Sequence, residues 1–125
     1  MTRLKRSLTV LKQNKILSVL GLATRAGRVK SGEFSTEQAV KSFQAFLVLV
    51  AEDASDNTKK MFRNMCSFYE VPLFIHGTKE VLGAAIGKEL RASVAVCDQG
   101  FADLLTKRLA QEGYHPEIAE ETSES

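Results

Sequence analysis

An unbroken apolar run in the middle of the chain, Phe46–Ala51, most strongly limits how this sequence can fold. The run reads Phe-Leu-Val-Leu-Val-Ala and is bounded by polar residues on both sides. A segment of this length without alternation is typical of a strand that is buried on both faces. Because such a strand needs cover above and below, the run predicts an α/β fold with helices on both faces of a sheet.

Helical and strand-like segments alternate along the rest of the chain. Apolar spacing predicts a helix from Asn14 that stops at Gly27, a second helix after the junction at Gly32, a third that carries residues 61–69, a fourth between Thr78 and Gly87, and a fifth over residues 101–112. Further strands are predicted over residues 29–31, 71–76 and 92–97. This alternation predicts a sheet of parallel strands.

Several polar and apolar positions define these helices more closely. Ser35 and Gln38 match a capping-box pattern, which places a helix start near Ser35 or Thr36. Ala39, Val40 and Phe43 are expected to form the apolar face of that helix. The next helix has a broader apolar face made of Met61, Phe62, Met65, Cys66, Phe68 and Tyr69. Its expected caps are Asp53, Ser55 and Asp56.

The length of 125 residues fits one domain, which we assign to residues 14–114. Residues 1–13 form a basic extension, either a short amphipathic helix or an arm that orders on a partner. Residues 115–125 form an acidic tail that we expect to be disordered. No apolar run approaches the roughly 20 residues that span a bilayer, and the start does not resemble a secretory signal. The sequence has two cysteines, Cys66 and Cys97, which we expect to be reduced thiols. It therefore predicts a cytoplasmic protein without a metal site. We also expect no membrane partner.

The formal net charge of +2 hides an asymmetry between the two ends of the chain. Residues 1–32 contain eight Lys or Arg and no acidic residue, so the remainder has nine basic and fifteen acidic residues. A basic N-terminal region beside an acidic tail indicates contact with nucleic acid. A solvated charged face is the alternative explanation on charge alone.

The basic residues lead into a helix start. Arg25, Arg28 and Lys30 precede Gly32, which opens a helix. Backbone amides at a helix N-terminus attract phosphate, so this junction is a candidate anion site. Phe34 follows directly and can either stack on an unpaired RNA base or pack onto its own helix as a hydrophobic staple.

Carboxylates follow the predicted strands and suggest a different activity. Glu52, Asp53, Asp56 and Asp98 lie where open α/β folds place their active sites, and such groups can hold magnesium for phosphoryl chemistry. The commoner role of these residues is helix capping. No nucleophile–base pair and no glycine-rich nucleotide loop accompanies them, so we expect no enzyme activity and no cofactor.

Four separated segments resemble one known superfamily. They read Leu-Gly-Leu-Ala-Thr-Arg-Ala-Gly-Arg-Val-Lys-Ser-Gly-Glu, Leu-Val-Leu-Val-Ala-Glu-Asp-Ala-Ser-Asp-Asn-Thr, Tyr-Glu-Val-Pro and Leu-Gly-Ala-Ala-Ile-Gly-Lys. Their order and spacing resemble the kink-turn RNA-binding ribosomal proteins, which include archaeal ribosomal protein seven-Ae and eukaryotic thirty-e, and in particular the bacterial YlxQ-like branch. The match covers about residues 14–112.

This resemblance implies a single-domain, three-layer α-β-α sandwich with a small mixed β-sheet, in which the strand at Val29 departs from the parallel arrangement. It also implies that the junction at Gly32 grips RNA with a sharply kinked stem. The family's reading loop falls on Lys30, Gly32, Glu33, Phe34, Ser35 and Gln38. The loop that covers extruded bases falls on Arg91, Ala92, Ser93 and Val94.

The sequence departs from the family pattern at the residues that read bases. Typical members have Asn and Glu where this chain has Phe34 and Ser35, and Lys where it has Gln38. Phenylalanine cannot form the hydrogen bonds that read sheared guanine–adenine pairs, whereas the glycine, the cation and the amides are retained. By analogy with DNA readout, two lost contacts of about 1–3 kcal/mol each would weaken specific binding by roughly two orders of magnitude.

The function expected from these observations is binding of a kinked or ribosome- and translation-related RNA with altered base selectivity. A protein-interaction module on the same fold, with a decayed RNA surface, is the alternative, because an exposed Phe34 would also suit a protein-docking anchor.

Overall fold

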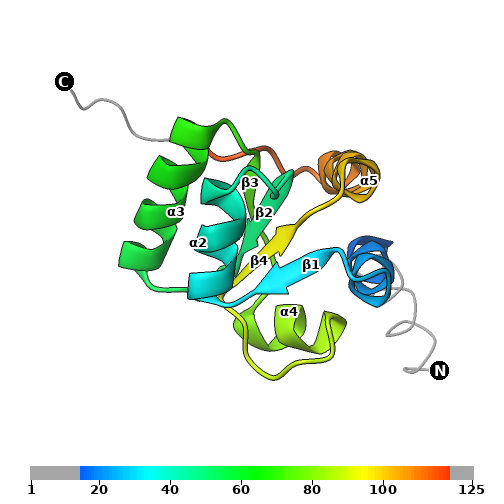
Figure 1. Ribbon diagram of the computed structural model, residues 1–125. Helices are drawn as coiled ribbons and strands as arrows, with labels where there is room; N and C mark the ends of the chain where they lie inside the picture. Colours follow the sequence, from blue (N-terminus) through cyan, green and yellow to red (C-terminus); the bar gives the residue numbers. More distant parts are fainter. Residues whose placement is uncertain (1–14, 119–125) are drawn as a thin grey trace.

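A computed structural model describes residues 15–118 of the chain and shows a sheet between two layers of helices (Figure 1). The first helix occupies residues 15–25 of the described part and is called the N-terminal helix below. The other elements are β1 (Val29–Ser31), α2 (Glu33–Lys41), β2 (Leu47–Val50), α3 (Asp56–Tyr69), β3 (Leu73–Ile75), α4 (Lys79–Ala85), β4 (Ser93–Val96) and α5 (Gln99–Gln111).

The four strands are arranged in the order β1-β4-β2-β3. β2 and β3 are parallel, whereas β4 is antiparallel to both β1 and β2. The mixed sheet implied by the family resemblance is therefore confirmed, but the strand that departs from the parallel arrangement is β4 and not the strand at Val29, because β1, β2 and β3 run in the same direction. The all-parallel arrangement inferred from alternation is wrong. Its failure has a simple cause, because an apolar run marks a buried strand equally well in either direction.

The centre of the sheet is the core of the molecule. All four residues of β2 are inaccessible to solvent, as the apolar run predicted. Figure 1 shows α2 and α3 on one face of the sheet, and α5 with the N-terminal helix on the other. Ile16, Leu20 and Ala23 are buried, so the helix predicted from residue 14 packs one face against the core.

Two aromatic side chains that were expected to face inward are exposed. Phe43 and Phe68 are 74% and 79% accessible, and both meet the ring of Tyr69 edge to face. Phe43 lies beyond the end of α2 and has φ of 61°, so it does not continue the helical stripe. Phe68 lies six residues after the buried Phe62, which rotates it about 120° away from that residue on a helix of 3.6 residues per turn.

Three of the helices begin with a side-chain cap. Ser55, Thr78 and Asp98 accept hydrogen bonds from the amides of Thr58, Val81 and Phe101, respectively. The expected capping box at Ser35 is wrong, because α2 already begins at Glu33 with Gly32 at the N-cap position. The chain turns there because the Gly32 amide is held by the carbonyl of Ser93 at 3.0 Å.

The segment after α5 packs back against the sheet beyond residue 114, where the sequence analysis placed the end of the domain. The Glu117 amide donates to the carbonyl of Leu73 at 2.7 Å, and its carboxylate pairs with Arg63 at 3.0 Å. The expectation of disorder from residue 115 therefore does not hold at Glu117. The basic extension and residues 119–125 of the acidic tail lie outside the described residues. Within residues 15–118, no helix has both the length and the apolar character needed to cross a membrane.

Candidate nucleic-acid interface

The junction between β1 and α2 is built around Gly32. This residue has φ 91° and ψ 159°, a region of backbone space that is essentially restricted to glycine. The first α-helical backbone bond runs from the Thr36 amide to the Gly32 carbonyl at 2.9 Å. The amides of Glu33, Phe34 and Ser35 therefore precede the helical ladder and point out of the helix end. Among the described residues no side chain caps this end, so it can accept an anion.

The space above Gly32 is open. A Cβ atom built on this glycine would meet nothing within 4 Å among the described residues. The glycine is thus required by backbone conformation and not by packing. An outside group can approach the backbone closely at this point.

The segment over residues 91–94 lies against this junction, as the family resemblance implied. Arg91 Nε donates to Ser31 Oγ at 3.0 Å, and Ser93 Oγ donates to Thr36 Oγ1 at 3.2 Å. Ser31 is also the register partner of Val94 in the β1–β4 ladder. Two parts of the chain that are 60 residues apart therefore form one surface.

The residues of this second segment have different roles. Arg91 and Ala92 are partly exposed, so their side chains can meet a ligand. Ser93 and Val94 are inaccessible and belong to the packing beneath the surface. Arg91 is fixed at three points, because its main-chain amide also donates to the Lys79 carbonyl and its Nη1 donates to the Leu90 carbonyl.

A groove of about 320 Å³ follows the outer side of α2 from this junction. Its lining residues are Lys30, Phe34, Ser35, Gln38, Ala39, Ser42 and Gln44. Phe34 is 74% accessible, so it is not buried as a hydrophobic staple would be. Four of the predicted site residues thus line one concave surface, and Glu33 is exposed beside it.

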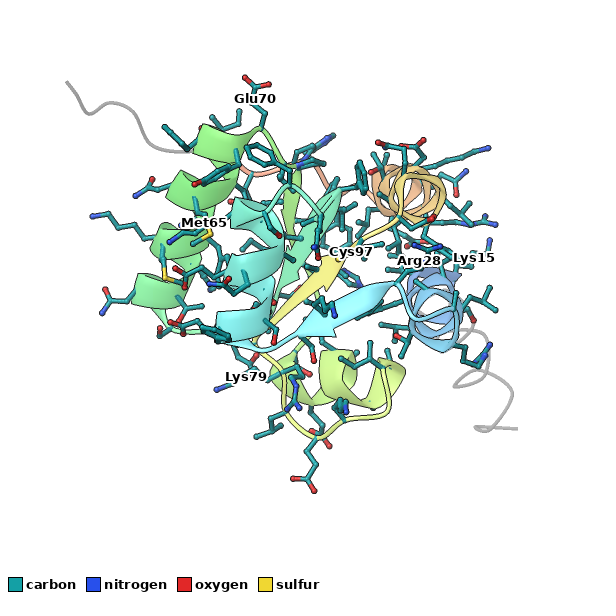
Figure 2. All side chains as sticks on the ribbon, in the orientation of Figure 1. Lys15, Arg28, Met65, Glu70, Lys79 and Cys97 are labelled. Atoms are coloured by element: carbon teal, nitrogen blue, oxygen red, sulfur yellow. The ribbon has the colours of Figure 1, made fainter. Side chains whose placement is uncertain are left out.

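The predicted basic cluster is divided by β1. Lys30 reaches the groove, whereas Arg25 and Arg28 lie at the other end of the strand, roughly 10 Å away for three extended residues. Figure 2 shows Arg28 where the chain passes from the N-terminal helix into β1, far from Lys79 at the start of α4. Arg25 instead lines a separate groove of about 560 Å³ between the N-terminal helix and α4. The structure therefore does not bring Arg25 and Arg28 to Gly32.

The positive charge of Lys30 acts on the thiol of Cys97. Burial raises the pKa of the Cys97 thiol, and the positive charge of Lys30 opposes this shift. Lys30 pairs with Ala95 in the β1–β4 ladder and Cys97 lies two residues after Ala95, so the side chains of Lys30 and Cys97 lie on the same face of the sheet. The side chain of Lys30 lines the groove and forms no ion pair with another residue of the described part of the chain, so its charge can contact a phosphate.

The candidate magnesium carboxylates do not converge. β2 and β4 are antiparallel, so residues that follow them lie at opposite ends of the sheet. Asp53 Oδ1 accepts a hydrogen bond from the Lys79 amide at 2.8 Å, and Asp98 Oδ2 accepts one from the Phe101 amide at 2.9 Å. Both carboxylates serve as helix caps, although Asp53 serves α4 and not the next helix as expected. Residues 15–118 contain no group of three His, Cys, Asp or Glu side chains that could hold a metal ion.

Sequence reasoning missed several contributors to this surface. Thr36 and Ser31 hold the segment over residues 91–94 in place, and Ser42 and Gln44 complete the groove. One signal was available for Thr36. Ser93 is a polar residue in an otherwise apolar strand, and a buried hydroxyl requires a hydrogen-bond partner.

Comparison with known proteins agrees with this architecture. The model of the ribosomal protein L7Ae/L30e/S12e/Gadd45 family matches residues 14–106. The RNA-binding protein YlxQ of Bacillus subtilis is 47% identical over 91 residues, which cover 73% of this chain and 91% of that protein. The YlxQ protein of Enterococcus faecium is 39% identical over 90 residues, covering 72% of this chain and 86% of the relative.

Two solved structures resemble the fold. A Bacillus halodurans protein described as having unknown function superposes with a TM-score of 0.75 at 38% identity, covering 77% of this chain and 97% of the other. The 15.5kD RNA binding protein of Giardia lamblia superposes with a TM-score of 0.68 at 18% identity, covering 80% and 86%, and therefore shows the fold alone. The names of the two YlxQ proteins describe RNA binding and no enzyme activity. The chain belongs to the ribosomal protein L7Ae/L30e/S12e/Gadd45 family, in its YlxQ-like branch.

Proposed function

We propose that this protein binds structured RNA through the surface made by the β1–α2 junction, the groove along α2 and the exposed residues Arg91 and Ala92. The observation that carries the proposal is the meeting of the uncapped start of α2 with the segment over residues 91–94. Membership in a family whose curated relatives are named RNA-binding proteins supports it. The proposed ligand is a sharply kinked stem in ribosomal or other translation-related RNA, met in the cytoplasm.

The chemistry of the surface explains how the phosphate backbone would be held. The amides of Glu33, Phe34 and Ser35 carry the partial positive charge of a helix start. Lys30 and Arg91 supply full charges on either side of Gly32. Arg91 has its Nε occupied by Ser31, so it is held in place before RNA arrives. Such contacts position RNA without reading its sequence.

The proposed base selectivity differs from that of a typical kink-turn reader. Phe34 has no side-chain group that could make the hydrogen bonds of Asn to sheared guanine–adenine pairs, and Ser35 is too short to replace the Glu. Gln38 keeps hydrogen-bonding groups but lacks the charge of a lysine. We therefore expect weaker discrimination between a kink-turn and other bent stems.

A titration of the full chain with a labelled kink-turn hairpin and a straight duplex tests this function. Binding of the hairpin at micromolar or lower concentration, tighter than binding of the duplex, is the expected outcome. Lys30→Ala should weaken binding to both RNAs and reduce the slope of log affinity against log salt by about one. Lys107→Ala removes an equally exposed lysine from α5 and should leave the slope unchanged. Failure of both RNAs to bind at moderate salt would reject the proposal.

A protein-interaction module is the second candidate, and the exposed aromatic residues Phe43 and Phe68 favour it. Large exposed apolar side chains often mark protein-binding surfaces. The absorbance ratio of the purified protein before and after a high-salt wash distinguishes the two candidates. Only an RNA-binding protein should carry nucleic acid that salt removes.

A further inference from the structure

The groove along α2 has the shape and chemistry of a small binding site. Its volume of about 320 Å³ is at the lower end of the range for small-molecule sites. One aromatic ring, two amide side chains and one lysine line it, at Phe34, Gln38, Gln44 and Lys30. This combination suits a flat, polar-edged ring that is attached to an anion.

Phe34 is the least explained of these residues. It lies in the first turn of α2 and is 74% accessible, so the fold gains little from its apolar surface. The buried residues of α2 are Thr36, Ala39 and Val40. An exposed ring beside a helix start is the arrangement on which unpaired bases stack, because every base offers an aromatic face.

The polar groups of the groove can meet the edge of a base. Gln38 and Gln44 are exposed, and each amide offers both donors and an acceptor. Ser42 is already engaged, since its hydroxyl donates to the Gln38 carbonyl at 2.7 Å. No aspartate or glutamate is among the described residues that line the groove, and the nearby Glu37 is paired with Lys41 at 2.7 Å.

A second aromatic groove shows why the site near Phe34 is the better one for RNA. Phe43 and Tyr69 line a groove of about 280 Å³ whose rim includes Glu70 and Asp103. Phe43 is as accessible as Phe34, so exposure alone does not distinguish the two. Carboxylates repel phosphate, whereas Lys30 attracts it. Charge therefore assigns the nucleotide to the groove of Phe34.

We propose that this groove holds one unpaired RNA base, stacked on Phe34 and hydrogen-bonded at its edge by Gln38 or Gln44, while Lys30 contacts the attached phosphate. The inference rests on the proposed RNA-binding function and adds to it a nucleotide site on the outer side of α2. In this arrangement Phe34 does not replace the lost hydrogen bonds of a typical reader. It substitutes stacking, which tolerates any base, for edge recognition of a base pair.

Fluorescence offers a direct test because the chain contains no tryptophan. Phe34→Trp places a single tryptophan in the groove, and stacking of a base should quench its emission. Phe43→Trp and Phe68→Trp are matched controls at 74% and 79% accessibility outside the groove, and their emission should change little. The probes are a kink-turn hairpin with unpaired loop nucleotides and the same hairpin with abasic sites at those positions.

Affinity measurements with the same probes complete the test. Phe34→Ala should weaken binding of the base-containing hairpin by about 5- to 140-fold, the range for one stacked base. The abasic hairpin should bind the wild type and Phe34→Ala alike, and Phe34→Trp should restore binding of the base-containing hairpin. Circular dichroism of Phe34→Ala should match the wild type, because the side chain is exposed.

The outcomes separate this inference from the function on which it rests. Hairpin binding without quenching of Phe34→Trp, or an equal loss for the abasic hairpin on Phe34→Ala, would overturn the base site and leave RNA binding intact. Phe34 would then be better explained as a protein-docking anchor. Absence of hairpin binding to the unsubstituted protein would overturn both.

Discussion

The starts of α2 and α4 lie on either side of the segment that leads into β4, but of these two only the start of α4 is capped by side chains among the described residues. The start of α4 is closed twice, by Thr78 Oγ1 on the Val81 amide at 3.1 Å and by Asp53 Oδ1 on the Lys79 amide at 2.8 Å. The start of α2 has Gly32, which has no side chain to offer. A cap there would add about 1 kcal/mol of stability. The comparison indicates that the amides of α2 are left available for an outside anion, whereas those of α4 are satisfied within the protein.

Glycine serves the two regions for different reasons. At Gly32 the backbone has positive φ, and the space beyond it is open among the described residues. At Gly83, inside α4, an added Cβ would overlap the backbone carbonyl of Glu89. One glycine gives a ligand access to the backbone, and the other lets the loop before Arg91 pack against α4.

The largest effect is expected from Gly83→Ala. The added methyl group must displace the backbone of Glu89, and overpacking of this kind costs about 3 kcal/mol. A urea denaturation curve should show the loss of stability. RNA binding should weaken too, because the displaced loop leads to Arg91. Gly21→Ala in the N-terminal helix is the control, since its Cβ would lie 3.4 Å from the Ala85 carbonyl oxygen and should be tolerated. A Gly83→Ala protein as stable as the wild type would contradict the packing role.

Gly32→Ala should have the next largest effect on stability and a larger effect on function. An alanine in this backbone region costs about 1–3 kcal/mol, although its methyl group meets no described neighbour. The helix start would rotate to relieve the strain, so hairpin affinity should fall together with stability. Unchanged affinity in a destabilised Gly32→Ala protein would separate the helix start from RNA binding.

Thr78→Ala should affect stability alone. Loss of the side-chain cap should lower the free energy of unfolding by about 1 kcal/mol, as measured by urea denaturation. Hairpin affinity should equal that of the wild type, because the amides at the start of α4 are capped within the protein and are not expected to contact RNA. Any marked change in affinity would weaken the contrast between the two helix starts.

The smallest expected effect is a pH dependence at His76, which lies just before the turn into α4. Burial lowers the pKa of His76 from its ordinary value of 6.5, although the carboxylates of Glu52 and Glu112 oppose the shift. The unfolded chain therefore takes up a proton more readily than the folded protein, and stability should fall as the pH drops below about 6.5. His76 Nδ1 has no hydrogen-bond partner among the described residues. The imidazole ring packs edge to face with Tyr114, and the two ring centroids are 4.6 Å apart.

Thermal unfolding between pH 7.5 and 5 measures this dependence. Replacing the histidine with His76→Phe keeps an aromatic ring against Tyr114 and removes the proton uptake. The part of the pH dependence that belongs to His76 should then disappear. An identical pH profile in the variant would assign the effect to other groups.

The sequence predicted the existence of most elements but not the direction of the strands. The apolar run at Phe46–Ala51 identified β2 because full burial leaves a clear pattern. The orientation of β4 is set by long-range pairing, which leaves no local pattern. Asp53 illustrates the same limit, since it caps a helix that begins 26 residues later.

The candidate site was predictable in part. Lys30 and Phe34 are close in sequence, and the structure places both of them in the groove along α2. Arg28 and Arg25 precede Gly32 by only four and seven residues, but the extended β1 separates them from it. The contact of Arg91 with Ser31 spans 60 residues, so it was accessible only through the resemblance to a known family.

That 60-residue separation has a consequence for the order in which the protein matures. While the chain is being synthesised, the Gly32 amide has to wait for the Ser93 carbonyl that holds it, because Ser93 is added 61 residues later. Within residues 15–118, β1 is an edge strand that pairs with β4 alone, so it cannot join the sheet before β4 is made. Contacts this distant in sequence also slow folding. An incomplete nascent chain therefore lacks the proposed RNA surface, and we expect RNA affinity to appear only after β4 has joined the sheet.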